Sequence, residues 1–253
     1  MDSLALCLEN FLSFTEMLGE SPAGDLFRTQ EGSVAGASGV ESAGENYALF
    51  RPGATEEELS SVISFFGVRR LPFAVPVFPG LDDKFCRTLS RHDIEKRHEY
   101  TAMSLPLAGV SRAWNGGLFQ ARPADKGSVA EWGQTVWLGF GDTGRADAQT
   151  AKHAAYLASC PANSLYYLKI DGSPVCAGLL HKSANCCGLY YFATPPEYRR
   201  RGYAGRLLAA LAAKAAEGAD ELVLLATSAG RPVYEKFGFQ PLAPVPVRMK
   251  GRE

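Results

Sequence analysis

The chain has 253 residues, enough for one large domain or two of ordinary size, and its hydrophobic share of 46% is typical of a globular protein. The net charge of −1 gives no overall reason to expect nucleic acid or an anionic membrane as a partner. The start of the chain lacks the pattern of a signal peptide, no apolar run is long enough to span a bilayer and the six scattered cysteines form no CxxC pair, so we expect a cytoplasmic protein with reduced thiols and no metal site.

The first half of the chain predicts short strands and two helices. Three short strands are expected at DLFRTQ, SVAGASGV and NYALFRP. The segment TEEELSSVISFF is predicted to be a helix, because Thr55 followed by Glu58 three residues later is the capping-box pattern. A strand at LPFAVPVF, a helix over Asp82–Ser90 and a strand at EYTAMSL complete this half.

The second half predicts a strand, two helices, an antiparallel meander and a final α/β segment. Asp171-Gly172 is a strong hairpin turn signal between two of the strands. In chain order, the expected elements are a strand at 117–122, helices at 126–140 and 147–159, strands at 164–170, 174–181 and 186–194, a helix at 203–217, a strand at 221–227, a short helix at 232–237 and a strand at 245–250.

The two halves share a local order of strand, proline, turn and helix. It occurs in YALFRPGATEEELSSVISFF and again in YFATPPEYRRRGYAGRLLAAL, which predicts a diverged internal repeat and domains at 1–112 and 113–253. Two unrelated α/β segments are the alternative. The first copy has Glu56, Glu57 and Glu58 where the second has arginines, so we expect only the second copy to bind an anion.

The turn of the second copy combines cations with glycines at the start of a helix. Gly202 and Gly205 allow a ligand to approach the backbone closely, and the helix start offers unpaired N–H groups and a positive dipole end. These features predict a pyrophosphate site, with a solvated arginine cluster as the alternative. The arginines of this turn are Arg199, Arg200, Arg201 and Arg206.

Two motifs at a suitable separation resemble the GNAT N-acetyltransferase superfamily. The segment RRRGYA at 199–204 matches the family signature R/Q-x-x-G-x-G/A, and VYEKFGF at 233–239 is similar to the family segment lYeklGF. The resemblance covers about 117–250 and implies the GNAT fold, an α/β (α+β) arrangement in which a mostly antiparallel mixed sheet is flanked by helices. The first half resembles the degenerate first copy of tandem GNAT proteins.

The resemblance implies roles for particular residues toward acetyl-CoA, the expected cosubstrate. The backbone of the strand before the signature would bind the pantetheine arm, the turn would bind the pyrophosphate, and Tyr234 would be the general acid that protonates the departing thiolate. The implied cofactor-binding residues are Phe192, Ala193, Thr194, Arg199, Arg200, Arg201, Gly202, Tyr203, Ala204 and Gly205.

The sequence departs from the family mainly at the general base. Some members carry Glu or His at the strand positions that are Gly188 and Tyr190 here, and Thr227 and Gly230 replace a frequent Asn and Ala. His181 is a candidate base, although a lone histidine is more often structural. A water chain or an acceptor amine of low pKa would remove the need for a base. The aromatics expected beside the acceptor, which are more often core residues, are Trp132, Trp137, Phe140 and Tyr156.

These features predict an N-acetyltransferase that moves an acetyl group from acetyl-CoA to an amine by direct attack. The alternatives are a non-catalytic module that binds acetyl-CoA or CoA as a regulatory ligand, and an acyltransferase for a longer acyl-CoA. The pattern leaves the acceptor amine unidentified, and we expect a monomer or homodimer that binds neither nucleic acid nor a membrane.

Overall fold

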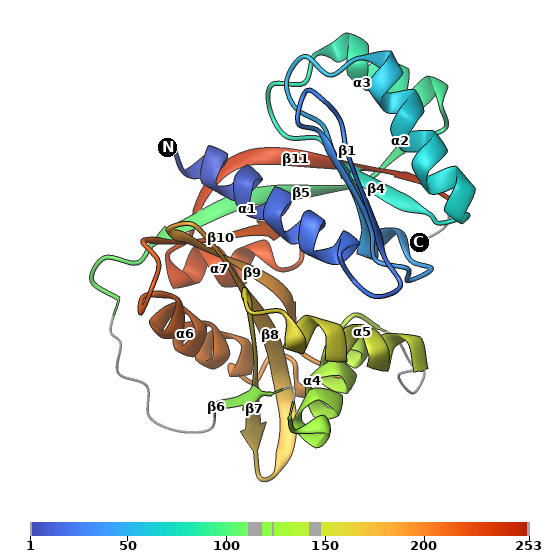
Figure 1. Cartoon of the computed structure of the whole chain (residues 1–253). Helices are drawn as coiled ribbons and strands as arrows, with labels where there is room; N and C mark the ends of the chain where they lie inside the picture. The colour runs from blue at the N-terminus through green and yellow to red at the C-terminus, as the bar shows by residue number, and fades with distance from the viewer. Residues whose placement is uncertain (1, 111–117, 123, 142–147, 252–253) are drawn as a thin grey trace. The chain divides into compact units, whose positions relative to one another are not determined.

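The computed structural model describes residues 2–110, 118–122, 124–141 and 148–251, which form two compact units (Figure 1). Unit 1 comprises Met1–Asn10, Met103–Leu224 and Gly230–Pro241. Unit 2 comprises Phe11–Ala102, Leu225–Ala229 and Leu242–Glu253. Helix α1 (Ser3–Gly19) and strand β5 (Glu95–Pro106) pass from one unit into the other, so the units are interleaved along the sequence.

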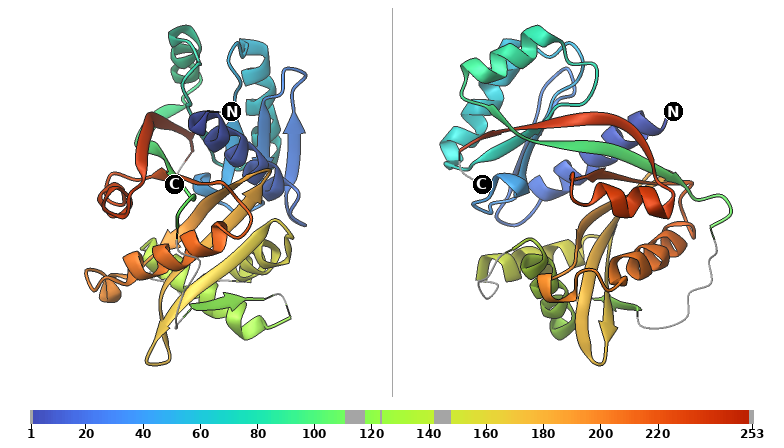
Figure 2. Two further views of the ribbon diagram at one scale, coloured as in Figure 1. Left: turned by 90° about the vertical axis from the view of Figure 1, so that its left-hand side faces the viewer. Right: turned by 180° about the vertical axis from the view of Figure 1, so that it is seen from behind.

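Unit 1 is built on an antiparallel meander with helices on both faces. In sequence order its elements are β6 (Leu118–Ala121), α4 (Lys126–Gly139), α5 (Ala148–Ser159), β7 (Asn163–Ile170), β8 (Ser173–Ser183), β9 (Cys186–Ala193), the 3₁₀ turn η2 (Pro196–Tyr198), α6 (Tyr203–Ala215), β10 (Glu221–Ala226) and α7 (Arg231–Phe237). The strand order is β10-β9-β8-β7-β6, and only the β9–β10 pair of this series is parallel. Helices α4 and α5 lie on one side of β7–β9 and α6 lies on the other (Figures 1 and 2).

Helix α6 forms because its leucines and alanines recur at helical spacing. Leu207, Leu208 and Leu211 are fully buried, and burial of one such side chain stabilises the fold by about 1.5–3 kcal/mol. The helix therefore packs against β7 and β8. This packing fixes the position of its first turn, which begins at Tyr203 after the segment that follows β9.

Unit 2 repeats the plan of a sheet covered by helices. Its elements are β1 (Asp25–Arg28), β2 (Val34–Ala37), the 3₁₀ turn η1 (Ala43–Glu45), β3 (Asn46–Leu49), α2 (Glu56–Arg69), β4 (Phe73–Pro76), α3 (Asp83–Arg91) and β11 (Gln240–Lys250). The strand order is β1-β2-β3-β4-β11, with β3 and β4 parallel. Helices α2 and α3 cover one face through a buried cluster that includes Phe66, Phe73 and Leu89. On the other face, Phe11 of α1 packs edge-on against Tyr47.

The order of elements agrees with the prediction apart from one helix. Helix α1 was not predicted, although Cys7, Phe11, Phe14 and Leu18 are buried at the spacing of one helix face. The predicted domain boundary at 112/113 lies outside the described residues, and the division into 1–112 and 113–253 stays a prediction. Within the described part of the chain, no helix is long and apolar enough to cross a membrane.

The predicted capping box at the start of α2 is present. The Glu58 backbone N–H donates to Thr55 Oγ1 at 3.2 Å, and the Thr55 backbone N–H donates to Glu58 Oε2 at 2.9 Å. The hydroxyl of Thr29 donates to the other Glu58 oxygen at 2.6 Å. Both N-terminal orphan amides and the buried carboxylate are thereby satisfied.

Replacing Thr55 with alanine is expected to lower the free energy of unfolding by about 0.5–2 kcal/mol, because one N–H of the first turn loses its acceptor. Urea unfolding followed by circular dichroism measures this. Ser61→Ala, on the exposed face of the same helix, is the matched control and should change stability by less than about 0.5 kcal/mol. Equal effects of the two substitutions would contradict the capping role.

Candidate functional site

Strand β9 contains a bulge and continues beyond its last residue pair with β10. The β9–β10 ladder has three residue pairs and ends at Gly188↔Val223, whereas β9 continues to Ala193. Between the pairs Leu179↔Tyr190 and Ala177↔Ala193, β9 uses one more residue than β8, and Tyr191 takes the left-handed region with φ 48°. A bulge disrupts the ladder and redirects side chains, so β9 departs from regular pairing just before the turn.

The turn between β9 and α6 leaves the helix start open. Gly202 is the N-cap of α6 with φ 81°, and no side chain caps the helix. Arg200 also has positive φ, at 59°. A Cβ atom at Gly202 or Gly205 would meet no atom within 4 Å. The first N–H groups of α6 therefore face open space beside the two glycines, which is the arrangement that binds phosphate groups.

The four arginines of the turn have different roles in the structure. Arg200, Arg201 and Arg206 are exposed around the start of α6. Arg199 instead donates from Nε to the Thr194 carbonyl at 2.9 Å and from Nη2 to the Gly139 carbonyl at 2.8 Å. It thus fastens the turn to the end of α4, and its predicted contact with the cofactor stays a prediction.

Tyr234 lies buried in α7 next to the strand predicted to bind pantetheine. Its ring centroid is 5.9 Å from that of Phe192 and 5.6 Å from that of Phe239. Burial, and to a smaller extent the neighbouring Cys176, raises the pKa of the Tyr234 phenol above its ordinary value. The phenol is therefore neutral at physiological pH and holds a proton that it can donate.

Cys176 and Thr194 form a polar pair beside Tyr234. The Cys176 Sγ and Thr194 Oγ1 atoms are 3.1 Å apart. Burial raises the pKa of the Cys176 thiol to about 12, and the hydrogen bond with Thr194 only partly opposes this. Since the thiolate is the nucleophilic form, Cys176 is not suited to accept an acyl group at neutral pH.

The position at which some family members carry a base is occupied here by a side chain from α1. The Tyr190 hydroxyl donates to Asn10 Oδ1 at 2.7 Å, and Asn10 Nδ2 donates to the His181 carbonyl at 3.1 Å and to Ser183 Oγ at 2.7 Å. A Cβ atom at Gly188 would lie 1.9 Å from Asn10 Oδ1. A larger residue at 188 is therefore excluded unless Asn10 moves.

His181, the candidate base from sequence, is part of this buried network. It is 1% exposed, and its Nδ1 lies 2.8 Å from Asn163 Oδ1. Burial lowers the pKa of the His181 imidazole to about 4. The ring is thus neutral at physiological pH and a weak proton acceptor, which supports the structural interpretation.

The four aromatics expected beside the acceptor differ in their surroundings. Trp132 is fully buried and donates from Nε1 to the Gly178 carbonyl at 3.1 Å, so it belongs to the core. Phe140 is 60% exposed, and Tyr156 and Trp137 are half-buried. The rings of Trp137 and His153 both lie next to the ring of Tyr191, the residue at the bulge. Nothing in the sequence indicated this contact.

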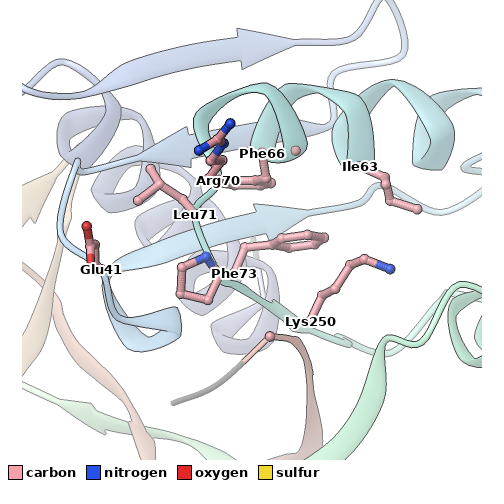
Figure 3. Close-up of a pocket in the computed structure, with 10 residues that line it drawn as sticks. Glu41, Ile63, Phe66, Arg70, Leu71, Phe73 and Lys250 are labelled. Atoms are coloured by element: carbon pink, nitrogen blue, oxygen red, sulfur yellow. The ribbon is translucent and has the colours of Figure 1, made fainter.

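Unit 2 contains a separate hollow of about 400 Å³ beside α2 and β4 (Figure 3). Phe66 and Phe73 form part of its wall, and Arg70 and Lys250 lie along it. Lys250 Nζ donates to the His92 carbonyl at 2.5 Å. None of the residues predicted to bind the cofactor lines this hollow.

Comparison with known proteins places the open turn within a recognised domain. Residues 161–241 match the family described as acetyltransferase (GNAT) domain. Residues 161–241 therefore belong to a GNAT acetyltransferase domain. The matched segment contains β9, the arginine–glycine turn and Tyr234, so the predicted family is confirmed. A search of curated protein sequences gave no match.

Solved structures extend the GNAT fold to nearly the whole chain. A GCN5-related N-acetyltransferase from Kribbella flavida is 14% identical with a TM-score of 0.65, and the match covers 97% of this chain and 96% of that chain. A putative GNAT-family acetyltransferase from Novosphingobium aromaticivorans is 17% identical with a TM-score of 0.58, covering 98% and 97%.

A tandem GNAT protein from the clavulanic acid biosynthesis pathway is 11% identical with a TM-score of 0.54, covering 98% of this chain and 96% of that chain. At these identities the likeness concerns the fold alone. It confirms the predicted fold class, in which a GNAT-like first half precedes the GNAT domain.

Proposed function

We propose that this GNAT-domain protein is an acetyl-CoA-dependent N-acetyltransferase that transfers the acetyl group directly to an amine. The observation that carries the proposal is the open turn between β9 and α6 together with the buried, protonated Tyr234 beside the same strand. The open turn suits an anionic acetyl donor, and Tyr234 suits protonation of the thiolate that leaves this donor.

The turn fits the pyrophosphate of CoA. The open space beside Gly202 and Gly205 lets phosphate oxygens approach the first amides of α6, and Arg200 and Arg201 add positive charge nearby. Beyond the last pair with β10, the backbone of Phe192 and Ala193 at the end of β9 and of Thr194 just after it would bind the amides of the pantetheine arm. Tyr203 and Ala204 contribute their backbone amides at the helix start.

The side chains favour direct transfer over an acyl-enzyme. The amine nitrogen attacks the thioester carbon and releases a proton to solvent, the C–N bond forms, the C–S bond breaks, and the leaving sulfur takes the proton of Tyr234, which solvent replaces. The Cys176 thiol beside Tyr234 remains protonated at neutral pH, so it does not compete as a nucleophile. The acceptor amine, a cytoplasmic location and a monomeric or homodimeric state stay predictions.

Release of CoA thiol from acetyl-CoA in the presence of a panel of amines tests this function. We expect amine-dependent thiol release and an acetylated product of matching mass. Tight acetyl-CoA binding without turnover on any amine would favour the non-catalytic CoA-binding module. Turnover only with a longer acyl-CoA would favour the alternative acyltransferase. The position of the Tyr234 ring beside Phe192 supports the catalytic interpretation.

Acetyl-CoA is expected to bind at one site per chain, in unit 1. The corresponding turn of unit 2 begins α2 with Glu56, Glu57 and Glu58, and Glu58 is already engaged in the capping box. Carboxylates at this helix start repel phosphate groups. Isothermal titration should therefore give a stoichiometry of about one, and a value of two would contradict the assignment.

A further inference from the structure

A tyrosine–histidine pair lies on the α4/α5 side of the β9 bulge, among residues to which no role has been assigned. His153 Nε2 of α5 is 3.0 Å from the hydroxyl of Tyr191, the bulge residue with φ 48°. His153 is 5% exposed, whereas Tyr191 is half-buried. Tyr191 is therefore the member of the pair that is partly exposed to solvent.

The surroundings of the pair hold Tyr191 in one orientation. Its ring is edge-on to Trp132 at 5.7 Å and to Trp137 at 5.9 Å between centroids. The indole Nε1 of Trp137 is buried and has no hydrogen-bond partner among the described residues. A left-handed conformation in mid-strand costs about 1–3 kcal/mol for a residue other than glycine, so packing and the His153 hydrogen bond must offset this cost.

The bulge places this pair next to the residues of the proposed reaction. Tyr191 precedes Phe192, whose ring contacts that of the proposed acid Tyr234. The Tyr191 side chain lies on the α4/α5 side of β9 and that of Phe192 on the α6 side, so the Tyr191–His153 pair and Tyr234 flank the same end of β9 from opposite faces. The other candidate positions are unavailable, because Asn10 occupies the space at Gly188 and His181 is a neutral, buried member of a structural network.

We propose that Tyr191 and His153 together accept the proton of the acceptor amine, and that the acceptor is an aliphatic amine; this rests on the proposed N-acetyltransferase function. The protonated amine first gives one proton to the Tyr191 oxygen while the Tyr191 proton passes to His153 Nε2, and the neutral nitrogen then bonds to the thioester carbon and releases its second proton to solvent. Tyr234 gives its proton to the leaving sulfur. Solvent then restores the proton of Tyr234 and removes that of His153, so the overall products are the amide and CoA thiol.

The amine class follows from where the proton must go. An aliphatic amine is mostly protonated at neutral pH, and the ammonium form has no lone pair with which to attack the thioester carbon, so it depends on a positioned proton acceptor. An aromatic amine is already neutral and depends on such a group much less. A relay of two side chains is therefore useful mainly for the aliphatic class.

The test compares benzylamine with aniline in the thiol-release assay, using His153→Gln, Tyr191→Phe and the double variant. Glutamine can keep a hydrogen bond to Tyr191 but cannot take up a proton, and phenylalanine removes only the hydroxyl. With benzylamine we expect kcat to fall at least about 100-fold in each single variant, with acetyl-CoA affinity unchanged. The aniline rate should change much less. The double variant should lose no more than the singles, because the two groups act as a unit.

The controls are the same two kinds of substitution, Tyr to Phe and His to Gln, at positions outside the proposed relay. Tyr166→Phe on β7 and His98→Gln on β5 should leave both rates unchanged. Equal losses with both amines, or undiminished benzylamine turnover in a folded single variant, would overturn the relay. A wild type that acetylates aniline but no aliphatic amine would also overturn it. A wild type that acetylates no amine would instead overturn the proposed function itself. If one single variant does not fold, the other decides.

Discussion

Replacing Gly202 with glutamate is expected to weaken acetyl-CoA binding by at least about tenfold, measured by isothermal titration. Gly202 is the N-cap of α6, and a side chain there would enter the open space proposed for the pyrophosphate. A like charge about 4 Å away costs about 1 kcal/mol in water and about 4 kcal/mol near a protein surface, before steric exclusion is added.

A matched control separates binding from backbone strain. Gly53 precedes α2 with φ 88°, and a Cβ atom there also meets nothing within 4 Å. Gly53→Glu thus carries the same left-handed penalty of about 1–2 kcal/mol, but it lies at the acid-rich turn that we expect not to bind CoA. Its acetyl-CoA affinity should match that of the wild type. A folded Gly202→Glu protein with native affinity would show that the pyrophosphate lies elsewhere.

Replacing Tyr234 with phenylalanine is expected to lower kcat by about 100- to 10,000-fold, the usual contribution of general acid catalysis. The ring that packs against Phe192 and Phe239 remains, so stability and acetyl-CoA affinity should change little. The loss falls on turnover because the phenol proton matters as the C–S bond breaks rather than in the ground state.

Thermal unfolding and kcat measured on one preparation distinguish this role from simple packing. A packing residue would lower the melting temperature and leave the turnover per folded molecule unchanged. Tyr166→Phe removes another buried tyrosine hydroxyl of unit 1, away from the turn and α7, and should preserve kcat. An undiminished kcat in Tyr234→Phe would rule out the acid role.

Features that depend on a few neighbouring residues were predictable from the sequence. The capping box of Thr55 and Glu58 was predicted from their spacing and is present in the structure. The hairpin at Asp171-Gly172 joins β7 and β8, and both residues have positive φ. The open start of α6 followed from its glycines, because only local backbone geometry decides it. Helix α1 was missed because it is apolar on several sides, which obscures its amphipathic pattern.

Features that depend on distant residues came only from the tertiary structure. Asn10 accepts the hydrogen bond of Tyr190 across 180 residues of sequence, and a Cβ atom at position 188 would collide with both side chains. Arg199, one of three adjacent arginines, is used on carbonyl groups of Gly139 and Thr194 instead of standing free.

His153 and Tyr191 show the same limit at the candidate site. They are 38 residues apart and meet only because a bulge turns one strand residue toward α5. By itself the sequence determined the order of elements apart from α1, the family motifs and the open arginine–glycine turn, because spacing and local torsion encode them. Only the tertiary structure showed that Arg199 is hydrogen-bonded to carbonyl groups, that His181 is buried in a polar network and that His153 contacts Tyr191 of β9. Packing between segments that are distant in the sequence sets these contacts.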